Sequence, residues 1–168
     1  MQTRRSSRIF GQTRRHMRIV EMIRLFSSPR KRLLNRLAET AADAEMLAAS
    51  LTRHTEMCAY PTLKAGLEEL AAAEAAQANA IRKLLLQNGA WPKLAGQAPH
   101  EGSSNWERLR NDLALQVKIL RALQSQLSEW TAIDPQIAER LRESAKEEDR
   151  HIDRLRDLTL KCDPQALD

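Results

Sequence analysis

Hydrophobic residues recur along this chain at the three- and four-residue spacing of α-helices, in four long stretches. The spacing predicts helices over residues 31–58, 61–88, 104–131 and 134–162. Prolines at 61 and 135 suit the first turn of a helix, and Gly89 suits a helix end. Each helix would be roughly 40 Å long. Four helices of equal length predict an all-α, four-helix antiparallel bundle.

The second half of the chain repeats the first. Residues 60–84 and 134–158 match at a constant offset of 74. The residues that coincide at this offset are Pro61 and Pro135, Leu67 and Leu141, Glu69 and Glu143, Ala71 and Ala145, Glu74 and Glu148, Arg82 and Arg156, and Leu84 and Leu158. A repeat of this length predicts two helical hairpins of one design packed together.

The connection between the second and third predicted helices leaves two topologies open. Residues 90–102 form a loop of thirteen residues, which spans at most about 43–47 Å. That reach allows a crossover along the bundle, and a simple up-down-up-down bundle is the alternative. The two cysteines distinguish them, because a crossover brings Cys58 and Cys162 to the same end of the bundle.

Two glutamates fall at the centre of the predicted core. Glu74 and Glu148 each lie 13 residues beyond the proline that starts their helix, so they face each other about 20 Å along it. Asp43 is placed at a similar depth by its distance in sequence. Buried charges are costly unless they are paired or bind a metal. Since Glu148 and His151 share one helix face, we expect a metal site at Asp43, Glu74, Glu148 and His151.

These residues resemble those of the ferritin-like superfamily, specifically the rubrerythrin-like bundles. The resemblance covers about residues 31–160 and implies a Glu from the first and third helices and Glu-x-x-His from the second and fourth, together holding two iron or manganese ions. Glu148-x-x-His151 matches the fourth helix. The chain departs from the pattern at three places: Gln77 replaces a His, Gln116 (or Asp112) replaces a Glu, and Asp43 or Glu39 stands in the first helix.

The resemblance therefore implies a site with fewer ligands than the family's, which holds a single or weakly bound ion of iron, manganese or zinc. Its role would lie in iron handling or oxidative stress. The alternative is a vestigial polar layer without metal, in a bundle that serves for oligomerisation or partner binding. We expect His54 to be a surface or capping residue at the end of the first helix. No glycine-rich phosphate loop, Ser-His-Asp set or Cys-x-x-Cys pair supports a hydrolase, nucleotide or zinc-ribbon reading, and no catalytic residue is assigned.

Charge divides the chain unevenly. The net charge is +5, yet residues 1–36 hold eleven Arg or Lys and one acidic residue, whereas the remainder has 16 basic and 21 acidic residues. We expect a basic extension over residues 1–30, the bundle over 31–162 and a tail over 163–168. The extension fits a disordered segment, an organelle transit peptide, or a contact to anionic membrane or nucleic acid. Because two cysteines do not make a disulfide framework, we expect the protein in the reducing cytoplasm. We also expect a homo-oligomer.

Overall fold

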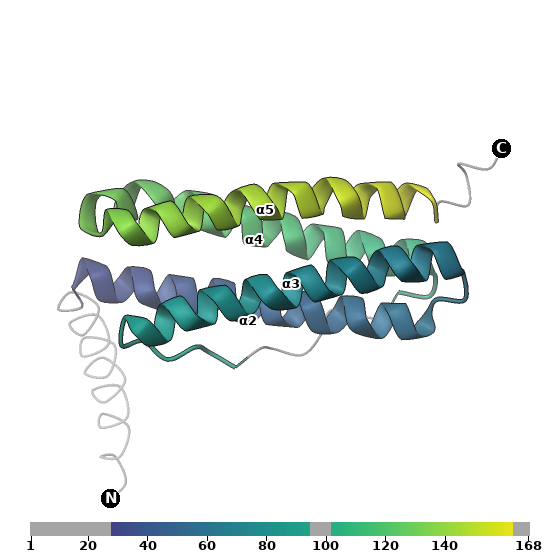
Figure 1. Ribbon diagram of the computed structural model, residues 1–168, viewed down its shortest axis with the longest axis horizontal. Coiled ribbons are helices and arrows are strands. Elements are labelled where there is room, and N and C mark those ends of the chain that lie inside the picture. The colour runs from purple at the N-terminus through teal and green to yellow at the C-terminus, as the bar shows by residue number, and fades with distance from the viewer. Residues whose placement is uncertain (1–27, 95–101, 163–168) are drawn as a thin grey trace, which may run out of the picture. The chain divides into compact units, whose positions relative to one another are not determined.

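The computed structural model describes residues 28–94 and 102–162, which form four α-helices and no strand. The helices are α2 (Pro29–Met57), α3 (Pro61–Gln87), α4 (Asn105–Ile133) and α5 (Pro135–Leu160). The predicted all-α four-helix bundle is confirmed, with α2–α3 and α4–α5 as its two hairpins (Figure 1). The predicted basic extension and C-terminal tail fall mainly on residues 1–27 and 163–168, outside the described ranges.

Local sequence signals set the helix ends. Ser104 caps α4 by accepting a hydrogen bond from the backbone N–H of Glu107 at 3.2 Å, and Asp134 caps α5 through Ile137 at 3.3 Å. Helix α3 ends at Gln87 with Asn88 as its C-cap, and Gly89 follows with a φ of +70°, in the left-handed region that favours glycine. There the N–H of Ala90 donates to the carbonyl of Leu85 at 3.0 Å, as in a Schellman motif.

The chain crosses over between α3 and α4. An ion pair between Arg36 and Glu129 at 2.6 Å joins the start of α2 to the end of α4, and His54 lies 2.6 Å from Asp112 where α2 ends and α4 begins. Helices α2 and α4 are therefore antiparallel neighbours. Because each hairpin is antiparallel as well, α3 and α4 run in the same direction (Figure 1).

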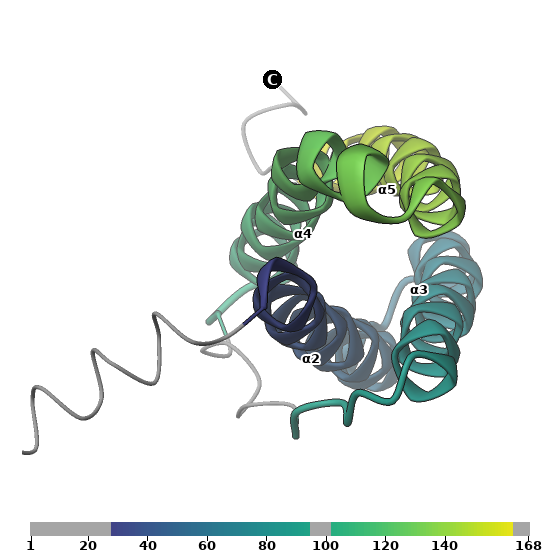
Figure 2. The same ribbon diagram turned by 90° about the vertical axis from the view of Figure 1, so that its left-hand side faces the viewer.

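The two cysteines agree with this topology. Cys58 follows α2 and Cys162 follows α5, and both pack on the same hydrophobic core. Burial and the neighbouring Cys58 together raise the pKa of the Cys162 thiol. Viewed along the helices, α2 lies diagonally opposite α5, between α3 and α4 (Figure 2). The crossover is thus the correct alternative of the two left open by the loop length.

The core consists mainly of leucine, isoleucine and alanine side chains, with a few buried polar groups among them. Glu74, Asp112, Gln116 and Glu148 are all fully buried, with no exposed surface. The expectation that Glu74 and Glu148 face inward is confirmed. Among the helices of the described ranges, none combines the length and apolarity needed to cross a lipid bilayer.

The crossover predicts that a short bismaleimide will link Cys58 to Cys162 within one chain. In an up-down bundle the two thiols would lie about 40 Å apart, beyond the reach of such a reagent. Tryptic digestion and mass spectrometry of the monomer band identify the linked peptides. Linkage found only between chains would contradict the topology.

Candidate metal centre

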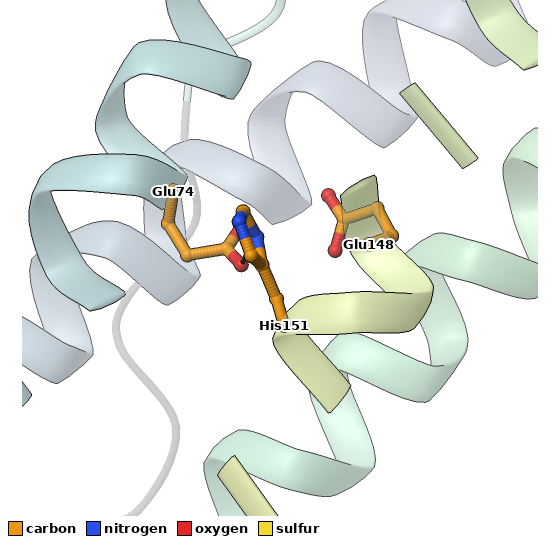
Figure 3. A group of neighbouring side chains, drawn as sticks. All are labelled: Glu74, Glu148 and His151. Carbon is orange, nitrogen blue, oxygen red and sulfur yellow. Dashed lines mark hydrogen bonds and ion pairs between the residues drawn. The ribbon is translucent and has the colours of Figure 1, made fainter. Parts of the chain in front are cut away.

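Three potential metal ligands meet between α3 and α5. Glu74 projects from α3, whereas Glu148 and His151 come from successive turns of one face of α5. One ligand atom from each of these side chains lies within 4.8 Å of the other two. Figure 3 shows Glu74 reaching from α3 to the imidazole of His151, with the Glu148 carboxylate beyond it.

Each glutamate accepts a hydrogen bond from the opposite helix. Nδ1 of His151 lies 2.6 Å from Oε1 of Glu74, and Nε2 of Gln77 donates to Oε1 of Glu148 at 3.0 Å. At the repeat offset of 74 residues, Gln77 corresponds to His151 just as Glu74 corresponds to Glu148. The two bonds are therefore related by the internal repeat, with an amide on one side and an imidazole on the other.

Gln116 of α4 supplies a third group to the cluster. Its Nε2 donates to Oε1 of Glu74 and, at 3.3 Å, to Oε2 of Glu148. Two buried oxygens nevertheless have no hydrogen-bond partner, namely Oε2 of Glu74 and Oε1 of Gln116. Both atoms are acceptors, and buried acceptors are nearly always satisfied in folded proteins. A further donor or a cation would satisfy these atoms.

Burial and like charge act together on Glu148. Burial, followed by the negative charge of Glu74, raises the pKa of Glu148 to about 7, and the amides of Gln77 and Gln116 partly oppose the rise. The hydrogen bond to Glu74 raises the pKa of His151, against the opposite effect of burial. Near neutral pH the cluster thus holds protons that a metal ion would displace.

Asp43, the fourth predicted ligand, is not brought to this cluster. Its carboxylate pairs with Lys118 at 2.8 Å, and the other candidate on this helix, Glu39, pairs with Lys93 at 2.6 Å. Helix α2 turns Ala41, Ala44 and Leu47 into the core instead. The position equivalent to Gln116 in the repeat is Ala42, which has no polar side chain.

A second buried polar group, which the sequence analysis did not identify, joins α2 to α4. Oδ2 of Asp112 lies 2.6 Å from Nδ1 of His54, and Oδ1 accepts from the hydroxyl of Ser50, also at 2.6 Å. The prediction of a surface or capping role for His54 is wrong, because the ring is buried by its pairing with Asp112. The spacing of His54 from the core residues Leu47 and Leu51 could have indicated this burial.

The donor set fits one metal ion and does not fit two. The ferritin-like pattern uses four carboxylates and two imidazoles, whereas two carboxylates and one imidazole meet here. Two carboxylates and one imidazole suit a single Fe²⁺, Mn²⁺ or Zn²⁺ ion with remaining coordination positions open. The unpartnered oxygen of Glu74 supports this fit, because a cation would satisfy it.

Comparison with known proteins does not assign a family. No protein-family model matches the chain, and no curated protein matches it. The function proposed below therefore rests on the geometry of the cluster and on the fold.

Stability of the metal-free protein should fall as pH rises from about 4.5 to about 7. In this window the folded protein keeps a proton on Glu148 that the unfolded chain releases, since the folded pKa is the higher one. His151 acts with the same sign, because its folded pKa is also raised and its contribution is lost as pH rises further. Glu148→Gln should remove about 1–3 kcal/mol of this dependence.

The measurement is urea unfolding followed by circular dichroism at several pH values, with a chelator present. Glu139→Gln, an exposed change on the same helix, is the control. Parallel curves for the wild type and Glu148→Gln would contradict the assignment of this titration to Glu148.

Proposed function

We propose that the protein binds a single transition-metal ion between α3 and α5, with Glu74, Glu148 and His151 as its ligands. The observation that carries the proposal is the convergence of these three side chains around a buried carboxylate oxygen that has no partner. Nδ1 of His151 and Oε1 of Glu74 lie 2.6 Å apart and share a proton, which a metal ion would displace.

Iron is the metal that we propose, with a role in iron handling or oxidative stress. The support is the resemblance of Glu148-x-x-His151 to the ferritin-like pattern, together with a bundle that has one crossover, as ferritin-like folds do. Bound iron would supply one-electron redox chemistry, and manganese or zinc suits the same ligands. Gln77 and Gln116 would hold the carboxylates in place through their amide donors.

Metal titration tests the proposal directly. Isothermal titration calorimetry with Mn²⁺, Zn²⁺ and anaerobic Fe²⁺ should give one equivalent per chain, and elemental analysis should find metal in protein purified without chelator. Affinity should rise between pH 5.5 and 7.5, because binding must displace protons from His151 and Glu148.

Two matched variants locate the site. His151→Gln should weaken binding at least about tenfold, the scale on which even supporting residues act. His54→Gln changes the other buried histidine that pairs with a carboxylate, and it should leave the affinity unchanged. Asp43→Asn should also have no effect. Equal losses in the His54 and His151 variants, or no metal bound to the wild type, would refute the proposed site.

A structural bundle without metal is the second candidate, and the hydrogen bonds favour it. Both carboxylates already have hydrogen-bond partners: His151 contacts Glu74, Gln77 contacts Glu148, and Gln116 contacts both. The negative charge of the cluster is therefore partly compensated without an ion. The function would then be oligomerisation or partner binding.

This candidate predicts that replacing Glu74, Glu148 and His151 together by leucine will keep or raise the midpoint of thermal unfolding. All three must change, because removing one member of a buried pair leaves the other uncompensated. Differential scanning calorimetry and the elution volume in size-exclusion chromatography report stability and assembly. If the triple variant keeps its assembly and stability but loses a metal-dependent activity, the metal proposal stands and this candidate falls.

A further inference from the structure

A groove on the α3–α5 face is lined by Gln77, a hydrogen-bond partner of the candidate metal ligand Glu148. It has a volume of about 290 Å³, and its walls include Gln77 of α3 and Glu143, Ser144 and Glu147 of α5. Gln77 also contacts the cluster, because its Nε2 donates to Oε1 of Glu148 at 3.0 Å and to the carbonyl of Ser144 at 2.9 Å. One half-buried side chain thus separates the groove from a fully buried ligand.

The members of the cluster differ in their access to solvent. Glu74, Gln116 and Glu148 have no exposed surface, whereas His151 keeps 16% of its side chain exposed. His151 lies one turn beyond Glu148 on α5 (Figure 3). Gln77 likewise lies one turn beyond Glu74 on α3. The two half-buried members of the cluster are therefore Gln77 and His151, which come from the two helices that border the groove.

The charge of the groove suits a cation. Its lining includes two carboxylates one helical turn apart, Glu143 and Glu147, and one cation, Arg140. Arg150, which does not line the groove, also pairs with Glu147 at 2.6 Å. A larger groove between α2 and α4 is lined instead by three cations, Arg36, Lys93 and Lys118, with two carboxylates from Glu39 and Asp43. A groove between α2 and α3 holds one carboxylate, Glu68. Neither of these grooves includes a residue of the cluster or a hydrogen-bond partner of one.

We propose that divalent metal ions enter and leave the cluster through the α3–α5 groove, with Gln77 as the gate and Glu143 and Glu147 as the carboxylates that attract the ion. The inference rests on the proposed metal-binding function and adds the route to it. When the Gln77 side chain rotates away, it opens the groove and at the same time frees Oε1 of Glu148 to bind the ion. Entry and ligand release are thus one movement of one side chain.

Stopped-flow transfer of Zn²⁺ from a chromophoric indicator measures entry, and transfer back to excess chelator measures exit. Gln77→Ala removes the gate, so both rate constants should rise by about five- to tenfold, while their ratio, the affinity, changes less. A residue with only a structural role would alter stability or affinity without accelerating entry and exit together.

A charge variant provides an independent test. Glu143→Gln with Glu147→Gln should slow entry about three- to tenfold at low ionic strength, and the difference should vanish near 0.5 M salt, where surface charges are screened. Glu139→Gln is the matched control. Glu139 pairs with Arg142 on the exposed side of α5, at the same three-residue spacing as Glu147 and Arg150, so both changes break one such ion pair. Glu139, however, does not line the groove.

The two levels of the proposal fail in different ways. If Zn²⁺ binds the wild type with normal affinity but entry and exit rates in both groove variants match those of Glu139→Gln, the route is overturned and the metal site stands. If the wild type binds no metal at equilibrium, the proposed function fails and the route fails with it. Accelerated exchange in Gln77→Ala together with salt-sensitive slowing in the charge variant supports the route.

Discussion

Two carboxylates at the same depth of a bundle core repel each other, and the packing of α3 against α5 depends on how that repulsion is relieved. Each glutamate receives a donor from the helix that carries the other: His151 for Glu74 and Gln77 for Glu148. A slip of either helix by one residue would rotate these donors away and leave a charge buried without a partner, at a cost of several kcal/mol. The register of the two helices is therefore tied to the chemistry between them.

The antiparallel helices α2 and α4 are fixed in a similar way. Asp112 of α4 is held by His54 and Ser50 of α2, so a buried carboxylate with an imidazole occurs in both pairs. The two groups differ in what they leave unsatisfied. Both oxygens of Asp112 have partners, whereas one oxygen of Glu74 has none. This difference separates the pair of Asp112 and His54 from the cluster at which we propose that a metal ion binds.

Sequence signals with a local cause predicted the fold well. Pro61, Ser104 and Pro135 mark helix starts to within a residue, because capping depends on neighbours in sequence. The depth of Glu74 and Glu148 followed from counting residues along each helix. The direction in which Asp43 points could not be predicted in this way, because the distance along a helix does not give the rotation of that helix about its axis. The spacing of His54 from Leu47 and Leu51 was consistent with burial, but its partner Asp112 lies 58 residues away, and no local pattern identifies that partner.

The paired bonds of Glu74 and Glu148 imply a two-fold axis that runs between them at right angles to the helices. Two separate copies of one hairpin could assemble about such an axis, each contributing a glutamate and the residue three positions later. Joining those copies into a single polypeptide requires a linker that travels from one end of the bundle to the other, because the symmetry places the end of the first copy far from the start of the second. The crossover is then a geometric consequence of fusion. Within a single chain the two halves need not be identical, and the equivalent positions carry Gln77 in one half and His151 in the other.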